Sequence, residues 1–387
     1  MKIGIALFSY NRSKHLNQVL SGLESNKRVD KLYIFQDGLK CETHRSAWQE
    51  TREIINQVTW CKKICYFSDY NKGLAKSIVD GVNIVLEEND GVIVLEDDCV
   101  PTDNFIDFMY QCFEKYQNNK NIYSVSGYAW PIDVKKTQYD VYACGRISSW
   151  GWGTWKDRWE IYQKDYEHIK KMKQGELTSR NLGIWGHDLE DTLVGNVKGE
   201  CDSWAVFWAL NVISKEGICI NPYKSLIRNI GMDGSGVHCG STERFEVEIE
   251  DKKKDKFNLP ENIFFMDETI KAFASLYGSY TAINQEDTSK KRILVYGLGN
   301  FYLQKEKNIN ENYVVEAFID HKKNGWFAGK KIITLNEIVQ YKYDKIIIMV
   351  KDTNESIKIA EQLMDNGIST EQILLGLNIF DNENIGK

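Results

Sequence analysis

The chain has 387 residues, a length that predicts two or three domains, each with a buried core. Hydrophobic residues make up 42% and charged residues 27%, which is typical of folded globular proteins and excludes disordered and fibrous classes. Its 49 Lys and Arg against 55 Asp and Glu give a net charge of −6, which excludes a global positive field able to gather nucleic acid.

The beginning of the chain, Met1-Lys2-Ile3-Gly4, enters a strand-like segment without the basic and apolar regions of a signal peptide, so we expect no export. The longest apolar runs, such as Val92 to Leu95 and Ile346 to Val350, have strand length, so we expect no membrane span. The 9 cysteines are scattered and odd in number, without paired zinc spacing. We therefore predict reduced thiols and a cytoplasmic location.

The first third of the chain alternates between buried-strand patterns and helical patterns. Strands are predicted at 3–8, 31–35 and 91–95. Apolar residues at helical spacing predict helices between these strands, at 16–23 and 74–86, and after the last one, at 105–116. This alternation predicts an α/β fold with a mostly parallel sheet that carries helices on both faces.

Polar residues follow the predicted strands, at the edge where ligands of such sheets bind. The three adjacent carboxylates of Glu96-Asp97-Asp98 would repel one another without a cation, and carboxylate oxygens suit Mg²⁺ or Mn²⁺. The alternative is a solvated turn or a helix cap. Arg12 fits a phosphate, a base or a surface ion pair. Asp37 fits a uracil imide, a ribose hydroxyl or an Asp-Gly turn.

Several segments in this order resemble the GT-A glycosyltransferases, with the family-2-like and N-acetylglucosaminyltransferase I type as the nearest likeness. The resemblance covers about residues 1 to 245 and includes an Asp-X-Asp-like motif that reads Glu-Asp-Asp. It rests on Phe8-Ser9-Tyr10-Asn11-Arg12, Phe35-Gln36-Asp37-Gly38, Asn71-Lys72-Gly73-Leu74-Ala75-Lys76-Ser77, Val92 to Pro101, Tyr123 to Gly127, Trp150 to Trp155 and Gly234 to His238.

The resemblance implies an inverting transfer from a nucleotide sugar. Asp98 would hold the metal, Glu96 and Asp97 would contact the donor sugar or ribose, and Asp37 would contact the uracil. Arg12 and Lys76 would complete the donor site. The catalytic base would be an acidic residue before a tryptophan, which Asp202 before Trp204 matches best; Asp188, Glu190 and Asp191 stay as alternatives.

Two further sets of residues are candidates for the same site. His238 would supply another metal ligand or a phosphate contact, although a loop histidine is more often neither. Trp150, Trp152 and Trp155 would form a wall for a sugar ring, although packing beneath a glycine-rich loop explains each of them as well.

The rest of the chain divides into a charged and helical linker, residues 246–288, and a Rossmann-like domain, residues 289–387, after a first domain at 1–245. The last domain carries Gly297 and Gly299, with Asp320 about twenty residues later where a ribose-binding acid belongs. Tyr302 replaces the third glycine of the dinucleotide fingerprint. A nucleotide or NAD site and a degenerate docking module are both compatible with this pattern.

The sequence thus predicts a metal-dependent hexosyl- or N-acetylhexosaminyltransferase that uses a UDP-linked donor, with Mn²⁺ or Mg²⁺. The expected acceptor is a saccharide or a lipid-linked saccharide in surface polysaccharide synthesis, with no nucleic acid partner. A basic stretch around Lys164 leaves peripheral contact with the inner membrane face open, or is a solvated helix face. The alternatives are a sugar-phosphate nucleotidyltransferase and a non-catalytic nucleotide-binding scaffold protein.

Overall fold

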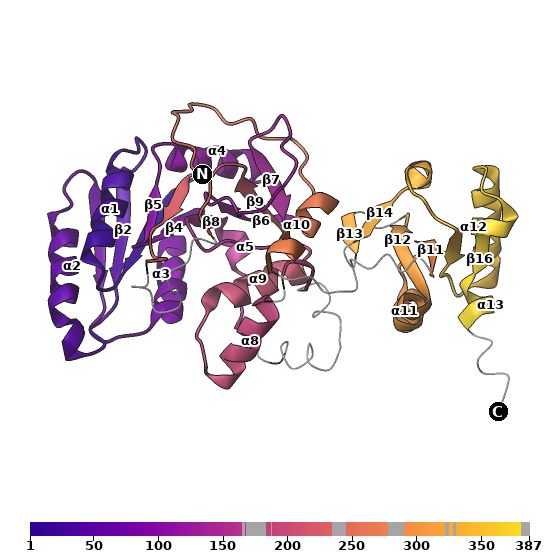
Figure 1. Ribbon diagram of the computed structural model, residues 1–387, viewed down its shortest axis with the longest axis horizontal. Helices are drawn as coiled ribbons and strands as arrows, with labels where there is room; N and C mark the ends of the chain where they lie inside the picture. The colour runs from indigo at the N-terminus through magenta and orange to yellow at the C-terminus, as the bar shows by residue number, and fades with distance from the viewer. Residues whose placement is uncertain are drawn as a thin grey trace. The chain divides into compact units, whose positions relative to one another are not determined.

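The computed structural model describes residues 1–164, 167, 183–186, 188–233, 245–277, 290–321, 325–327 and 330–380. The chain divides into two compact units, Met1–Tyr280 and Thr281–Lys387, each with its own sheet (Figure 1). Both sheets consist largely of parallel strands with helices packed against them. The predicted α/β class, with a large mostly parallel sheet and a second, smaller α/β unit, is confirmed.

The first unit is built on an 8-stranded sheet with the order β3-β2-β1-β4-β8-β6-β9-β7. Its first four strands run parallel to one another, whereas β8 runs antiparallel to both of its neighbours. The strands are β1 (Ile3–Ser9), β2 (Lys31–Gln36), β3 (Lys62–Phe67), β4 (Gly91–Glu96), β6 (Ile122–Ser126), β7 (Val141–Cys144), β8 (Trp152–Trp155) and β9 (Ile218–Pro222). Two short strands, β5 (Cys99–Pro101) and β10 (Ile227–Asn229), form a separate antiparallel pair.

Helices cover both faces of this sheet because successive strand residues point to opposite sides. Ile5 and Leu7 of β1 belong to a core shared with α1 (Ser13–Glu24), α2 (Arg45–Gln57) and α4 (Phe105–Tyr116). Phe8 faces the other side, where it lies against Gly81 of α3 (Leu74–Glu88). The helix α3 also contacts α9 (Trp204–Ser214). The first unit further contains α5 (Lys156–Trp159), α8 (Asp188–Lys198) and α10 (Asp267–Tyr277).

The structure adds one helix and one strand, α2 and β3, between the second and third predicted strands. Only Thr51 and Ile55 of α2 are buried, so its apolar pattern is sparse. No residue of β3 is fully buried, and the strand begins with Lys62 and Lys63. An edge strand and a surface helix bury too little for periodicity to reveal them.

Much of the segment predicted as a linker, residues 246–288, packs on the first unit. The Asn104 side chain donates to the carbonyl of Lys252 at 2.7 Å, and the Tyr116 hydroxyl donates to Pro260 at 3.0 Å. Further along, Phe265 bridges to Ala143 of β7, and Phe273 of α10 is fully buried. Residues 246–277 therefore extend the first unit beyond the predicted boundary at 245.

The second unit has a 6-stranded sheet with the order β13-β14-β12-β11-β15-β16. All neighbouring pairs are parallel except β13 with β14. The strands are β11 (Lys291–Tyr296), β12 (Tyr313–Ile319), β13 (Gly325–Phe327), β14 (Lys330–Ile333), β15 (Lys345–Ile348) and β16 (Ile373–Leu375), and the helices are α11 (Asn300–Asn312), α12 (Thr353–Asp365) and α13 (Gly376–Phe380). Separate apolar clusters line the two faces, as in doubly wound folds.

Two of the three tryptophans predicted to form a sugar wall belong to the core. Trp152 is fully buried and stacks on Trp204 with ring centroids 4.8 Å apart. Trp155 is exposed by only 2% and lies against Phe113. Both residues are in β8, a central strand, so their side chains fill the space between sheet and helices. They do not form an accessible wall, which corrects the expectation for these two positions.

We predict that Trp152→Ala lowers the free energy of unfolding by about 3–5 kcal/mol, because the change leaves a cavity beside Trp204. Urea unfolding followed by circular dichroism measures the change. Tyr70→Ala is the control, since that side chain is 63% exposed and its loss should cost less than about 0.5 kcal/mol. Equal losses in the two variants would contradict the assignment of Trp152 to the core.

Candidate functional site

The candidate site lies at the carboxyl edge of the first sheet, where the strand order reverses between β1 and β4. Phe8 pairs with Glu96, so the segment after β1 and the segment after β4 leave the sheet side by side. The first is Tyr10-Asn11-Arg12 and the second begins at Asp97. Reversal points of this kind are where parallel α/β sheets bind ligands.

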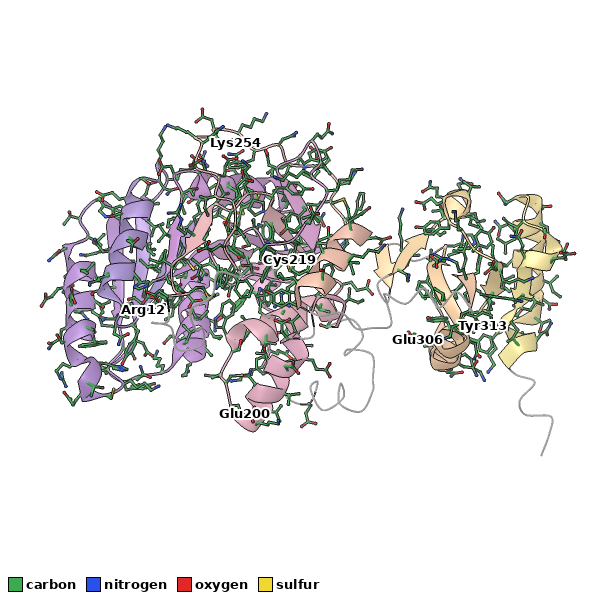
Figure 2. The ribbon with its side chains drawn as sticks, viewed as in Figure 1. Arg12, Glu200, Cys219, Lys254, Glu306 and Tyr313 are labelled. Atoms are coloured by element: carbon green, nitrogen blue, oxygen red, sulfur yellow. The ribbon has the colours of Figure 1, made fainter. Side chains whose placement is uncertain are left out.

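Arg12 joins the two segments by ion pairs to both aspartates. Its Nη2 pairs with Asp97 Oδ1 and lies 2.8 Å from Asp98 Oδ2. The backbone N–H of Tyr10 donates to the other oxygen of Asp97 at 3.2 Å. Figure 2 labels Arg12 inside the first unit, and its side chain is only 21% exposed. Two carboxylates from one turn thus converge on a single cationic group.

Burial dominates the electrostatics of this cluster. Burial, together with the charges of Asp98 and Asp97, raises the pKa of Glu96 to about 8. The pKa of Asp97 is raised to about 6 by burial, although Arg12 opposes the shift. Burial of Arg12 works against its own charge, yet the two aspartates raise its pKa above the ordinary value. The cluster therefore favours protons or cations over bare negative charge.

The segment after β10 packs against Asp98. Ile230 donates its N–H to the Asp98 carbonyl at 2.9 Å. A Cβ at Gly231 would lie 2.2 Å from Asp98 Oδ2, so this position needs glycine for a close approach. His15 of α1 holds the segment from the other side, since its Nε2 lies 3.2 Å from the Ile230 carbonyl oxygen and 3.1 Å from Asp233 Oδ2.

The sequence analysis did not identify Gly231 or His15, because neither lies at the end of a predicted strand. Gly231 begins a glycine-rich stretch that continues with Gly234 and Gly236, and this composition was the sequence signal for the segment. The predicted metal ligand His238 lies outside the described residues, as do all of residues 234–244.

The carboxylates fit a divalent cation of the Mg²⁺ type. Oxygens of Asp97 and Asp98 already share one cation, the Arg12 guanidinium. Mg²⁺-type metals bind one or two carboxylates and complete their coordination shell with phosphate oxygens and water. Within the described ranges, no three His, Cys, Asp or Glu side chains gather as a closed metal site. The donor set therefore suits a metal that arrives with a phosphorylated ligand.

Asp37 anchors a loop through its carboxylate. Its oxygens accept the backbone N–H groups of Gly38, Lys72 and Gly73 at 2.8, 2.8 and 2.9 Å. Gly73 has φ +80°, a conformation that favours glycine, and it directly precedes α3. Asp37 thus makes the turn that its Asp-Gly pair suggests and also fixes a second segment beside it.

Gln36 is a further residue that the sequence analysis missed. It is buried at the end of β2, and its amide donates to the carbonyls of Tyr10 and Trp48 at 3.1 and 2.8 Å. Its oxygen accepts from Arg52 of α2 at 2.5 Å. This network ties the segment that carries Arg12 to the α2 helix.

Lys76 of the predicted donor site pairs with Asp80 one turn later on α3, at 3.1 Å. Lys72 approaches the same carboxylate at 3.2 Å. The side chain of Lys76 is 58% exposed, so a pair of this kind contributes little to stability and is readily exchanged. The structure places Lys76 near the loop that Asp37 holds.

Asp202 lies just before the N-terminus of α9. It comes two residues before Trp204, which stacks on Trp152, and Trp152 pairs with Val94 of β4. Asp202 is 55% exposed and pairs with Lys164 at 2.7 Å. Its neighbour Ser203 caps α9 by accepting the N–H of Val206. The side chain of Asp202 is thus accessible and is not needed as the helix cap.

The alternative acid Asp188 has a structural partner. The buried guanidinium of Arg146 binds both of its oxygens, at 2.8 and 2.6 Å. Glu190 and Asp191 follow in the first turn of α8. The two-pronged pair with Arg146 fixes Asp188 in place, which favours Asp202 over Asp188 as a residue able to move toward a substrate.

Trp150 differs from the other two tryptophans of its segment because it is only partly buried. Its ring lies edge-on to Tyr128 at 4.5 Å and to Phe245 at 5.6 Å, measured between centroids. It precedes Gly151, whose positive φ of 58° and contact with Ile227 bring the chain close to β10. Trp150 is therefore the tryptophan of this segment that stays available for the predicted sugar wall.

The second unit has its own loop at a strand-order reversal, between β11 and β15. Gly297 adopts φ +95°, and the N–H of Leu298 donates to Asp320 Oδ2 at 3.1 Å. A Cβ on Gly299, the residue before α11, would meet nothing within 4 Å. Tyr302, in place of a third glycine, is buried in the core. The predicted nucleotide or NAD site at Gly297, Gly299 and Asp320 stays a prediction.

Comparison with known proteins gives one family match, confined to the second unit: residues 289–374 match the family model described as C2185-like, N-terminal. No curated protein matches the chain.

Among solved structures, TarS of S. aureus is 9% identical with a TM-score of 0.36, over 59% of this chain and 36% of TarS. A mannosyltransferase from Pyrobaculum calidifontis, in complex with GDP-Man and Mn²⁺, is 9% identical with a TM-score of 0.31, over 55% of this chain and 69% of its own. A cytidylyltransferase from Leptospira borgpetersenii is 12% identical with a TM-score of 0.28, over 46% of this chain and 73% of the cytidylyltransferase.

We predict that Glu96→Gln flattens the pH dependence of stability in metal-free protein. The raised pKa of about 8 means that the folded state holds the Glu96 proton more tightly than the unfolded state. The free energy of unfolding should therefore fall as the pH rises from about 4.5 to about 8, and the variant should lose the part of the fall that Glu96 contributes, while the part from Asp97 remains. Urea unfolding at several pH values measures it.

Glu88→Gln is the control for this prediction. Hydrogen bonds from Lys31 and Tyr33 lower the pKa of Glu88, so its carboxylate stays charged throughout this pH range. If the profiles of wild type and Glu96→Gln run parallel from pH 5 to pH 8, the electrostatic description of the cluster is wrong.

Proposed function

We propose that the first unit is a metal-dependent glycosyltransferase of the GT-A type. It would transfer a hexosyl or N-acetylhexosaminyl group from a UDP-linked sugar to a saccharide or lipid-linked saccharide, with inversion, in the synthesis of a surface polysaccharide. The observation that carries this proposal is the convergence of Asp97 and Asp98 on one cationic group at the reversal point of a parallel sheet.

The leaving group of such a reaction is a nucleoside diphosphate, which must be stabilised as its negative charge grows. Asp98 would hold Mn²⁺ or Mg²⁺, and the bound cation would supply most of that electrostatic stabilisation. Arg12 lies beside the same oxygens and offers guanidinium N–H groups to phosphate oxygens. Asp97 and Glu96 would orient the ribose and the sugar from the same turn.

Asp37 would recognise the base. A carboxylate has about four acceptor positions. Three N–H groups of the described chain occupy Asp37, so one acceptor position is left for the imide N–H of a uracil. The N–H groups of Lys72 and Gly73 also fix the loop before α3 at this place. Lys76 would leave Asp80 to contact the donor.

The transfer itself would need a base on the acceptor side. The acceptor hydroxyl oxygen attacks the anomeric carbon while the bond from that carbon to the phosphate oxygen breaks, and the proton passes to the base. Asp202 suits this role because its carboxylate is exposed, just before a helix whose cap is Ser203. Trp150 would provide the face on which the acceptor sugar rests.

The loop after β1 argues against a nucleotidyltransferase. Such an enzyme needs a glycine-rich loop to hold a triphosphate at this place. Here β1 ends at Ser9 and α1 begins at Ser13, and the three residues between them include no glycine. Release of pyrophosphate from a nucleoside triphosphate and a sugar phosphate would overturn this argument.

The donor site is tested by thermal shift with UDP, GDP, CDP and dTDP, each with and without Mn²⁺. We expect a metal-dependent stabilisation with a diphosphate, roughly 2.7 kcal/mol at a hundred times its Kd, that Asp98→Ala abolishes. Asp103→Ala is the matched control, because that exposed carboxylate lies outside the cluster and pairs with Ser25. Stabilisation that persists in Asp98→Ala would contradict the assignment.

The base is tested by turnover. Asp202→Asn should lower the release of UDP from a UDP-sugar in the presence of saccharide acceptors by about 10²-fold or more, with donor binding unchanged. Glu190→Gln serves as the comparison from α8. Loss of UDP release in Glu190→Gln, with full activity in Asp202→Asn, would contradict Asp202 as the base and assign that role to α8.

A further inference from the structure

We propose that Arg12 is an exchangeable internal cation: it occupies the position between Asp97 and Asp98 in the ligand-free protein, and a divalent metal enters only with a diphosphate that takes over its guanidinium. This inference rests on the proposed donor site and adds a binding order to it. Metal and nucleotide would bind together or hardly at all.

Arg12 and a metal need the same oxygens of the two aspartates. The Nη2 atom of Arg12 is 2.8 Å from Asp98 Oδ2 and also pairs with Asp97 Oδ1. A Mg²⁺-type ion must approach a carboxylate oxygen to about 2.0–2.1 Å. At that distance from the same oxygen, the metal would face the guanidinium across a few ångströms, and their like charges would repel.

Asp98 has little freedom to present another oxygen. Its Oδ1 lies 3.4 Å from the Cys99 thiol, and the backbone of Gly231 lies against Oδ2. Its carbonyl is held by Ile230, whose own carbonyl contacts His15. These contacts favour the orientation of the carboxylate in which Oδ2 faces Arg12, so a metal that uses Oδ2 replaces the guanidinium rather than binding beside it.

Arg12 is able to leave the two aspartates. It is the residue before α1, with φ −108° and ψ 70°, and its side chain is 21% exposed. A diphosphate offers a guanidinium several oxygens in a geometry that it binds in two-pronged fashion. Exchange thus replaces the two ion pairs of Arg12 by contacts to phosphate, while the metal replaces Arg12 at the aspartates.

The experiment uses the full chain, stripped of metal, and follows free aqueous Mn²⁺ by its EPR signal during titration. Wild type should bind Mn²⁺ alone weakly, and saturating UDP or GDP should tighten Mn²⁺ binding. Arg12→Gln should bind Mn²⁺ alone roughly 5- to 150-fold more tightly than wild type, with a smaller effect of the diphosphate.

Further variants locate the effect. Arg12→Gln/Asp98→Asn should lose the gain, because the added affinity arises at Asp98. Arg28→Gln should behave as wild type, since Arg28 is 49% exposed and pairs with Asp107 at the surface. Arg12→Lys keeps a charge but cannot bind two carboxylates as a guanidinium does, so its Mn²⁺ affinity should lie above wild type. Arg12→Lys replaces Arg12→Gln in the Mn²⁺ titration if Arg12→Gln does not fold.

The outcomes separate this inference from the proposed function. Equal affinity of wild type and both Arg12 variants for Mn²⁺ alone would overturn the exchange, even if UDP still bound in a metal-dependent way. Tighter Mn²⁺ binding by the Arg12 variants, with no diphosphate bound by wild type under any condition, would overturn the diphosphate half of the exchange and the donor site together.

Discussion

Three adjacent carboxylates at the end of a buried strand repel one another and need a positive partner, and the candidate site of the first unit depends on that electrostatic constraint. Glu96, Asp97 and Asp98 leave the sheet where burial makes negative charge costly. The partner, Arg12, comes from the neighbouring strand β1 through a link of three residues. The parallel pairing of β1 with β4 is what brings these charges together.

Main-chain groups organise the rest of the edge around this ion-pair cluster. Gln36, the last residue of β2, binds the carbonyl of Tyr10, and Asp37, the next residue, binds the N–H groups of Lys72 and Gly73 in the loop before α3. Ile230 and Gly231 close the edge against Asp98. Each of these contacts joins residues far apart in the sequence, so the site depends on the completed sheet rather than on any local motif.

The sequence allowed the strands β1, β2 and β4, the helices α1, α3 and α4, and the acidic turn to be predicted, because buried runs and strand-end polar residues are local patterns. The edge elements α2 and β3 escaped because they bury few side chains. Trp152 and Trp155 show a different limit of prediction from sequence. An aromatic residue in a glycine-rich segment suits a core or a ligand equally, and only the pairing of β8 with β4 decides.

The sequence placed Arg12 in the same site as the aspartates but did not predict that it pairs with them, since Arg12 lies 85 residues from Asp97. In the second unit, the same kind of reasoning found Gly297 and Asp320, whose loop and side chain do meet. The segment 246–288 was predicted as a charged and helical linker, yet the main chain and the few apolar residues of 246–277 pack on the first unit. Charge composition alone does not show where a segment packs.

The central claim is that the acidic turn is the place of a divalent cation and a nucleotide diphosphate. A crystal of the protein grown with Mn²⁺ and UDP, measured at the manganese absorption edge, tests it most directly. The account predicts one anomalous peak within coordination distance of Asp98 and the diphosphate, with Arg12 turned from the aspartates to the phosphate. A peak elsewhere, with Arg12 still bound to Asp97 and Asp98, would contradict it.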